Sequence, residues 1–308
     1  MPPLSLIICT HNPRAEFLRQ TLDAIRAQTL AHDQWEFLLI DNASKQPLAA
    51  AWDLSWHPNG RHVHENQLGL TPARLRGIRE ARGSLIVFVD DDNLLAPDYL
   101  EQAVAMAREW PMLGVWGGRI EGRYEVPPPA WTKPYLGMLA IREFDRDRWS
   151  NRYDDGEAHP CGAGMIVRKH VAEVYAAKVG SSQLRLGLGR KGASLASCED
   201  LDLAFTALDL GLGMGMFQRL RLTHLIPAAR LEQAYLLRLA ESGAFSSVIL
   251  RAFREQAHAR PSRARELYQK LRLPFMNSHD RQMELAFQRG VHKARVFLRS
   301  LQTQPDAM

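Results

Sequence analysis

Three consecutive aspartates, Asp90, Asp91 and Asp92, follow an apolar run and are the residues of this chain best suited to chemistry. Clustered carboxylate oxygens are good ligands for hard divalent cations, which in turn hold phosphates. Placed side by side, these carboxylates repel one another unless a cation or hydrogen-bond donors compensate. The alternative is an ordinary polar turn followed by a helix cap. The triple aspartate favours a site for a metal and a phosphate-bearing substrate.

A second acidic pair, Glu199 and Asp200, opens an apolar-periodic segment that predicts a helix over residues 197–211. Acids in a first helical turn can simply complement the helix dipole. A carboxylate there can also take a proton from a hydroxyl that becomes a nucleophile. His224, after a strand expected at residues 215–222, is a candidate metal ligand, although a lone histidine is more often structural.

Short apolar runs that alternate with amphipathic segments predict parallel strands covered by helices. We expect strands at residues 4–9, 35–40, 62–64 and 85–89, and helices at residues 14–28, 71–82 and 99–109. Because parallel strands end at one edge of a sheet, the loops that follow them meet in one crevice. Two further loops there are polar, with Thr10-His11-Asn12 and Asp41-Asn42-Ala43-Ser44. No glycine fingerprint or GxxxxGK[ST] loop occurs, so neither a dehydrogenase nor a P-loop NTPase is supported.

The second half of the chain is less regular in pattern. We expect a strand at residues 113–116 that ends at Gly117-Gly118, an irregular lobe over residues 119–160 that covers the site, a strand at 161–167, a helix at 168–178 and a mobile loop at 187–192. From Pro227 onward the pattern is helical, with breaks near Pro261 and Pro274.

The composition, 46% hydrophobic and 24% charged over 308 residues, is ordinary for a globular protein. The three cysteines have no paired spacing, so neither a disulfide framework nor a zinc knuckle is indicated. No apolar run is long enough for a membrane helix, and the first residues lack the basic start of a signal peptide. We therefore expect a cytoplasmic protein.

The net charge of +5 is unevenly distributed along the chain. Residues 251–300 contain twelve Lys and Arg and four Asp and Glu, a surplus of eight. Such a basic helical segment suits anionic lipid headgroups at the inner face of a membrane, or is a solvated surface. It contains no recognisable nucleic-acid-binding motif, so we expect no nucleic-acid partner.

In order and spacing, these segments resemble the family 2 glycosyltransferases of the GT-A fold, an inverting class that uses nucleotide-diphosphate sugars. The resemblance covers residues 4–225 and rests on LSLIICTHN, LLIDNAS, NQLGLTPARLRGIREARGSLIVFVDDDNLLAPDYL, CGAGMIVR and SCEDLDLAF. It implies an α/β fold with a Rossmann-like mixed sheet flanked by helices. The implied glycosyltransferase domain spans residues 1–225, with a nucleotide-binding half at 1–112 and an acceptor half at 113–225. A basic helical C-terminal extension at 226–308 follows.

The resemblance also implies roles for individual residues. The triple aspartate corresponds to the DxD motif of the family, and Asp200 corresponds to its general base. The implied donor-binding residues are Thr10, Asn12, Asp41, Arg74, Asp90 and Asp91, and the implied ligands of a Mn²⁺ or Mg²⁺ cofactor are Asp92, Asp90 and His224. Glu199 would bind an acceptor hydroxyl or raise the pKa of Asp200.

Two positions depart from the common family pattern. Leu75 stands where an asparagine is common, which weakens a contact to a phosphate or the start of a helix. Thr206 stands where an arginine is common, which removes a partner from an acidic side chain. Neither position belongs to the implied metal site or to the base.

The resemblance, together with the carboxylate chemistry, predicts a metal-dependent, hexosyltransferase-type enzyme that transfers a sugar to a glycan or lipid-linked acceptor. The resemblance implies inversion and, by default, a UDP-sugar donor. Its role would be in cell-envelope or exopolysaccharide biosynthesis. Basic C-terminal helices would bring it to the inner membrane face. Two alternatives stay open: a sugar-nucleotide-binding regulator without turnover, and a nucleotidyltransferase, although the glycine-rich loop expected of the latter is replaced by CTHNPR.

Overall fold

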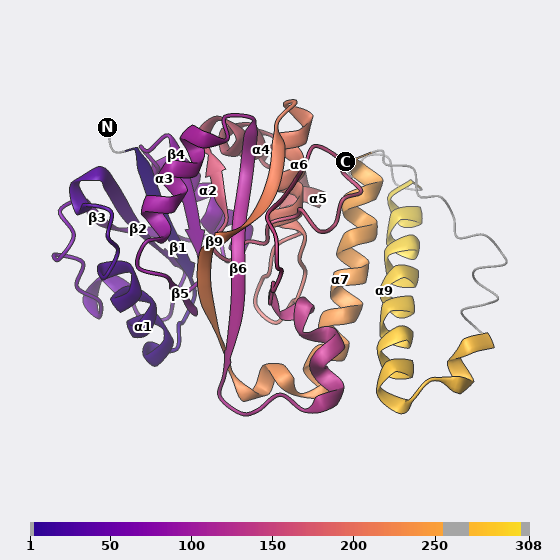
Figure 1. Ribbon diagram of the computed structural model, residues 1–308. Helices are drawn as coiled ribbons and strands as arrows, with labels where there is room; N and C mark the ends of the chain where they lie inside the picture. The colour runs from indigo at the N-terminus through magenta and orange to yellow at the C-terminus, as the bar shows by residue number, and fades with distance from the viewer. Residues whose placement is uncertain (1–2, 255–270, 303–308) are drawn as a thin grey trace.

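The computed structural model describes residues 3–254 and 271–302. These residues build one mixed sheet of nine strands with helices on both faces (Figure 1). The sheet order is β3-β2-β1-β4-β8-β6-β9-β5, and β7 pairs with β9. The expected break near Pro261 lies outside the described residues. The predicted fold class, a mixed sheet flanked by helices, is confirmed.

The first half follows the predicted alternation. Its elements are β1 (Leu4–Thr10), α1 (Ala15–Arg26), β2 (Trp35–Asn42), β3 (Gly60–Glu65), α2 (Leu70–Glu80), β4 (Leu85–Val89), β5 (Asn93–Leu95) and α3 (Tyr99–Glu109). Strands β3, β2, β1 and β4 are parallel, so their carboxyl ends share one edge. The short strand β5 was not expected.

The second half supplies the rest of the sheet and the outer helices. Its elements are β6 (Leu113–Tyr124), η3 (Ala130–Leu139), β7 (Arg148–Ser150), β8 (Ile166–Arg168), α4 (Lys169–Gly180), α5 (Gln183–Leu186), α6 (Glu199–Asp209), β9 (Gly213–Ile226), η4 (Ala228–Leu231), α7 (Gln233–Phe253), η5 (Leu273–Phe275) and α9 (Ser278–Gln302).

The apolar strands are buried on both faces because helices cover both. Ile7 of β1 belongs to one cluster together with residues of α2, α4 and α6. Its neighbours Leu6 and Ile8 belong to a second cluster, together with residues of α1 and α3. This opposite placement follows from the two-residue repeat of a strand. Because both faces of the sheet are buried, the strands appear in the sequence as continuous apolar runs.

Strand β6 corrects one sequence prediction, because it does not end at Gly117-Gly118. It continues to Tyr124 and pairs with β9 as far as Ile226, with a register shift after Gly118. A Cβ added at Gly118 would collide with the carbonyl of Leu220. This glycine therefore permits a close approach of two strands and does not mark a turn.

The expected strand at residues 161–167 is also wrong in extent, since β8 is only Ile166–Arg168. The preceding residues turn, and Gly164 has a φ of 72°, a conformation that favours glycine. The segment predicted as an irregular lobe, residues 119–160, contains regular secondary structure, since η3 and β7 lie within it.

Helices α7 and α9 lie side by side at one edge of the molecule (Figure 1). They run in the same direction, since Gln233 donates to Gln282 and, further along both helices, Arg289 pairs with Glu241. A Cβ at Gly290 would meet the carbonyl of Glu241, so this glycine allows the close packing of the two helices. In the part of the chain that the structure describes, no helix has the length and apolar character to cross a membrane.

Candidate active site

A cleft of about 430 Å³ lies at the carboxyl ends of β1, β2 and β4. Eight of the residues singled out in the sequence line it together: Thr10, Arg74, Asp90, Asp91, Asp92, Glu199, Asp200 and His224. The parallel strands bring Thr10 and the three aspartates to this edge, α2 supplies Arg74, and α6 and β9 supply the others. The fold therefore gathers both acidic groups around one space large enough for a small-molecule ligand.

Asp91 is a carboxyl group held in its neutral form more readily than usual. Burial, together with the neighbouring charge of Asp92, raises the pKa of Asp91 to about 7. The hydroxyl of Thr10 donates a hydrogen bond to its Oδ2. A cation next to these carboxylates would favour the ionised form of Asp91.

Asp92 is 4% exposed and has the opposite protonation preference. Burial alone would raise its pKa, but His224 and Arg230 outweigh that effect and lower the pKa to about 2. Its Oδ1 lies 3.3 Å from His224 Nε2, and its Oδ2 lies 3.0 Å from Arg230 Nη1. Asn93 Nδ2 also donates to Oδ1 over 3.1 Å. Asp92 is thus an ionised carboxylate among donors.

The hydrogen-bond partners of His224 determine its tautomer. Nδ1 lies 3.0 Å from the carbonyl of Leu139, which can only accept, so Nδ1 carries the hydrogen. Nε2 lies between Arg230 Nη1, at 3.1 Å, and Asp92 Oδ1, at 3.3 Å. The sequence prediction put His224 after the last strand, but the residue lies within β9, opposite Asn93 of β5. That pairing brings its ring to Asp92.

Arg74 joins the two acidic groups. It is 4% exposed, and its Nη1 lies 3.0 Å from Glu199 Oε1 while its Nη2 lies 3.7 Å from Asp90 Oδ1. Burial and the charge of Asp200 raise the pKa of Glu199 to about 7, against the effect of Arg74. A Cβ at Gly162 would collide with the guanidinium, so the glycine makes room for it.

Asp200 stands at the start of α6, and two backbone N–H groups orient its carboxylate. Its Oδ2 accepts from the N–H of Gly162 over 2.9 Å, and its Oδ1 accepts from the N–H of Leu201 over 2.8 Å. The helix begins directly after Cys198, whose φ is 83°. These contacts hold the carboxylate at the edge of the cleft, where a hydroxyl can reach it.

Two predicted donor-binding residues do not line this cleft. Asp41 is buried, and its two oxygens accept from the N–H groups of Ser44 and Leu48 over 3.1 Å and 3.0 Å. Burial opposes ionisation, but these donors prevail and lower the pKa of Asp41. Asn12 is exposed, and its Oδ1 accepts from the N–H of Lys45. Their contact with a nucleotide base stays a prediction.

Several residues of the cleft were missed in the sequence. Arg230 and Tyr235 come from beyond residue 225, and Arg190 and Lys191 come from the loop after α5. The basic surplus at residues 251–300 contains none of these four residues, and nothing local in the sequence indicates that Arg230 reaches Asp92. Burial raises the pKa of Cys9 to about 12, so that thiol stays protonated at neutral pH.

The position of Thr206 has a structural compensation. Asp202, which is completely buried, pairs with Arg185 Nη1 over 2.6 Å and with Arg254 Nε over 2.7 Å. Arg254, at the end of α7, also donates to the hydroxyl of Thr206 over 3.2 Å. The acidic helix therefore keeps arginine partners, although neither stands at position 206.

Leu75, the other departure from the family pattern, is buried in the apolar cluster under α2.

Within the described ranges 3–254 and 271–302, no three side chains of His, Cys, Asp or Glu converge on a ready-made metal site. Asp92 and His224 form a pair of possible ligands, with Oδ1 3.3 Å from Nε2. Mg²⁺ commonly keeps waters and uses only one or two carboxylates together with substrate phosphates. An ionised carboxylate beside an imidazole nitrogen fits that kind of site.

Comparison with known families gives a match over more than half of the chain. The sequence model of Glycosyl transferase family 2 matches residues 5–175. The chain belongs to glycosyl transferase family 2. The matched part of this family 2 protein includes Thr10, Arg74 and the triple aspartate, and it ends before Glu199 and Asp200.

Curated relatives of this family 2 chain match it over a shorter stretch. The "Putative glycosyltransferase EpsH" of Bacillus subtilis (strain 168) is 31% identical over 108 residues, which are 34% of this chain and 30% of that protein. "Glycosyltransferase AglE" of Haloferax volcanii is 28% identical over 108 residues, 34% and 35% of the two chains. The matches thus span about a third of these relatives' length.

Solved structures match nearly the whole chain. The mannosyltransferase PcManGT from Pyrobaculum calidifontis, in complex with GDP-Man and Mn²⁺, superposes with a TM-score of 0.55 at 19% identity, covering 98% of this chain and 76% of that one. S. aureus TarS 1-349 in complex with UDP-GlcNAc gives 0.55 at 13% identity, covering 94% and 82%. At such identities the likeness shows the fold, which is that of GT-A glycosyltransferases.

Proposed function

We propose that this protein transfers a sugar from a nucleotide-diphosphate sugar to an acceptor hydroxyl, with inversion and with the help of a divalent cation. The observation that carries the proposal is that the ionised Asp92 and the oriented Asp200 line one cleft. The first suits a cation, and the second suits a proton acceptor. Family membership supports sugar transfer as the reaction.

The donor would bind at the edge formed by β1, β2 and β4. Asp92, Asp90 and His224 would hold Mn²⁺ or Mg²⁺, which stabilises the charge of the departing diphosphate. Arg230 and Lys191, cations of the same cleft, would add attraction for the phosphates. A UDP-sugar is our default donor, since one solved neighbour contains UDP-GlcNAc, whereas another contains GDP-Man.

The acceptor would approach from the side of Asp200. As its oxygen bonds to the anomeric carbon, the bond from that carbon to the phosphate oxygen breaks, and the electron pair leaves with the diphosphate. Asp200 takes the proton of the acceptor hydroxyl. Attack on the face opposite the leaving group inverts the anomeric centre. The N–H groups of Gly162 and Leu201 keep the carboxylate in place during these steps.

We keep residues 1–112 and 113–225 as the proposed nucleotide-binding and acceptor halves. Arg230 and Tyr235 of the extension at 226–308 line the same cleft. The extension thus adds side chains to the proposed donor site.

Donor binding is the first property to measure, by thermal shift with UDP-, GDP-, ADP- and dTDP-sugars in Mn²⁺, Mg²⁺ or chelator. We expect a metal-dependent rise in melting temperature for one base series, because a ligand that binds the folded state stabilises it by RT ln(1 + [L]/Kd). A donor at about 100 times its Kd adds roughly 2.7 kcal/mol. No shift with any donor would contradict the proposal, and binding without turnover would favour a regulator.

We further propose that the acceptor is a glycan or lipid-linked molecule of the cell envelope, met at the inner face of a membrane. Helix α9 supports this, since its exposed side chains include Arg281, Arg295 and Arg299 beside Leu285 and Val296. Basic groups near an anionic surface contribute about 1 kcal/mol each.

Flotation with phosphatidylglycerol vesicles tests the membrane contact. We expect binding that 0.5 M salt abolishes, and that the double substitution Arg295→Glu with Arg299→Glu removes. The matched control is Arg19→Glu with Arg108→Glu, which changes two exposed arginines of α1 and α3 by the same charge. Equal flotation of the two double variants would refute a role of α9.

A further inference from the structure

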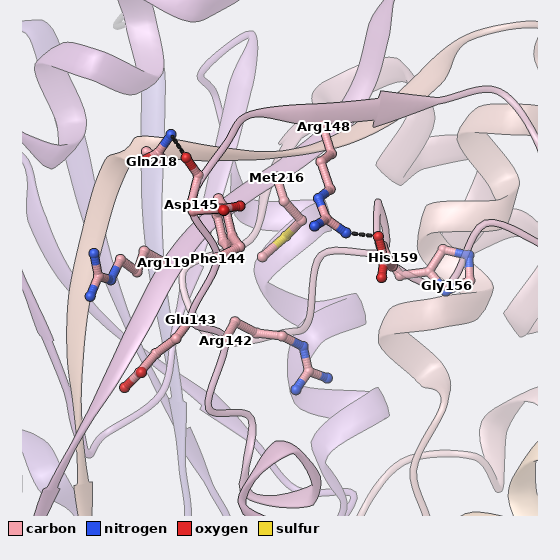
Figure 2. A pocket seen from close by; sticks show the side chains of 11 residues that line it. Arg119, Arg142, Glu143, Phe144, Asp145, Arg148, Gly156, His159, Met216 and Gln218 are labelled. Atoms are coloured by element: carbon pink, nitrogen blue, oxygen red, sulfur yellow. Dashed lines mark hydrogen bonds and ion pairs between the residues drawn. The ribbon is translucent and has the colours of Figure 1, made fainter.

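A second cavity, of about 730 Å³, lies beside the candidate active site, and nothing described so far uses it. Figure 2 shows Phe144 and Met216 in its middle, with Arg119, Arg142 and Arg148 around them. Its volume is in the range of known small-molecule sites. An apolar centre inside a ring of charged and amide groups is a lining that suits a ligand with both apolar faces and hydroxyl edges.

Two segments of the chain contribute to both the cavity and the cleft, through different residues. Along one segment, Ala140 lines the cleft and Arg142 lines the cavity. Along the other, His159 lines the cavity and Gly162 lines the cleft. His159 and Gly162 are three residues apart, so their Cα atoms are at most about 11 Å apart. Because Gly162 donates to Asp200, residues 159–162 lead along the chain from the cavity to that carboxylate.

Electrostatics agree with this proximity. Burial lowers the pKa of His159, while the charges of Asp155 and Asp200 act in the opposite direction. The imidazole thus lies within electrostatic reach of Asp200. In the described part of the chain, His159 Nε2 is buried without a hydrogen-bond partner. Such a group is commonly satisfied by a water or ligand in the adjoining space.

The charges of the lining balance. Arg148 forms an ion pair with Glu157, and Arg119 Nε lies 3.2 Å from Glu121. The lining also includes the carboxylates Glu143 and Asp145. A strongly anionic ligand would therefore meet repulsion as well as attraction. This balance favours an uncharged ligand rich in hydroxyl groups.

Arg142 is the cation of the lining whose guanidinium is fixed by backbone carbonyls and can still donate to a ligand. Its Nη1 donates to the carbonyl oxygens of Gly137 and Ile141 over 2.6 Å and 2.9 Å, which fixes the guanidinium plane. Over the described residues, Arg142 forms no ion pair with a carboxylate. Its remaining N–H groups can donate to neutral oxygens, and Phe144 offers a ring face to the apolar face of a sugar.

We propose that this cavity is the acceptor site and binds an uncharged oligosaccharide, one hydroxyl of which reaches Asp200. The proposal rests on the proposed glycosyl transfer. It adds the chemical class of the acceptor and the residues that select it. Phe144 and Met216 contact the apolar faces of the saccharide, and Arg142 and Gln218 bind its hydroxyl groups.

The test is a substitution that adds a large side chain to the lining of the cavity. A Cβ at Gly156, which lines the cavity, meets no atom within 4 Å, and the residue does not have a positive φ, so Gly156→Trp adds bulk without a backbone clash. Gly180 at the end of α4 has the same open surroundings and lies outside the cavity, which makes Gly180→Trp the matched control. Phe144→Ala removes the proposed stacking surface.

Binding is measured by saturation-transfer NMR with neutral oligomers of two to six units of glucose, galactose, mannose, N-acetylglucosamine or N-acetylgalactosamine, and with oligogalacturonates as anionic counterparts. We expect one neutral series to bind the wild-type protein and the Gly180→Trp variant. Gly156→Trp and Phe144→Ala should lose affinity by about tenfold or more, which corresponds to about 1.4 kcal/mol. All variants should bind the nucleotide-sugar donor equally.

Three results would overturn the acceptor site: unchanged saccharide binding in Gly156→Trp, preferential binding of oligogalacturonates, or binding of no neutral series by a wild-type protein that binds its donor. A protein that binds no nucleotide-sugar at all would instead refute the proposed function. The donor measurement thus separates the two failures.

Discussion

Asp200→Asn is expected to lower the rate of transfer by about 10²- to 10⁴-fold while leaving donor binding intact. The amide of Asn cannot take the acceptor proton. Its oxygen can still accept from the N–H of Gly162, as Asp200 Oδ2 does over 2.9 Å, so the local fold is retained. The measurements are kcat for sugar transfer at saturating donor and the thermal shift that the donor causes.

Glu199→Gln is the matched control for this prediction. Glu199 is the neighbouring acid, and because its pKa is raised to about 7, it is already partly neutral at neutral pH. Glutamine has the shape of that neutral form and can keep a contact with Arg74. We expect a smaller loss of kcat than in Asp200→Asn. Near wild-type turnover in Asp200→Asn would show that another group accepts the proton.

Asp92→Ala is expected to abolish metal-dependent donor binding. Asp92 is the carboxylate whose pKa is lowered to about 2, so it carries the negative charge that a cation needs, and its removal leaves His224 and Arg230 facing an empty space. Loss of a cation worth several kcal/mol of charge stabilisation lowers kcat/KM by about 10³-fold. Calorimetric titration of the donor in Mn²⁺ and in chelator measures the effect.

Asp91→Asn is the control for Asp92→Ala. Asp91 is an implied donor-binding residue but not an implied metal ligand, and the amide oxygen of asparagine can still accept from Thr10, so we expect donor binding that is weaker but still metal-dependent. Because a buried ion pair is lost in Asp92→Ala, the melting temperature of each variant is recorded without ligand. If folded Asp92→Ala bound donor with wild-type affinity in both Mn²⁺ and chelator, the metal site would be misassigned.

Apart from the short strand β5, the sequence alone was sufficient for the order of the sheet strands and the α-helices in the first half of the chain. Helix α3 was predicted with its observed bounds, Tyr99–Glu109, and β4 likewise spans Leu85–Val89. The signals there are local: apolar runs, helical spacing and polar residues at the strand ends act over a few neighbouring positions. Parallel pairing then brings the polar loops to one edge, which is why Thr10 and the triple aspartate meet as expected.

The contacts that shape the candidate site join distant parts of the chain. Arg74 and Glu199 are 125 positions apart, and Arg254 reaches Thr206 across 48. Such pairs depend on how finished elements pack, and residue spacing contains no local signal of it. The sequence by itself thus determined where most strands of the first half end and which polar side chains follow them. Only the tertiary structure decided that β9 and η4 bring His224 and Arg230 to Asp92, and that Arg142, His159 and Met216 line a second cavity. Both results come from packing between elements far apart in the chain.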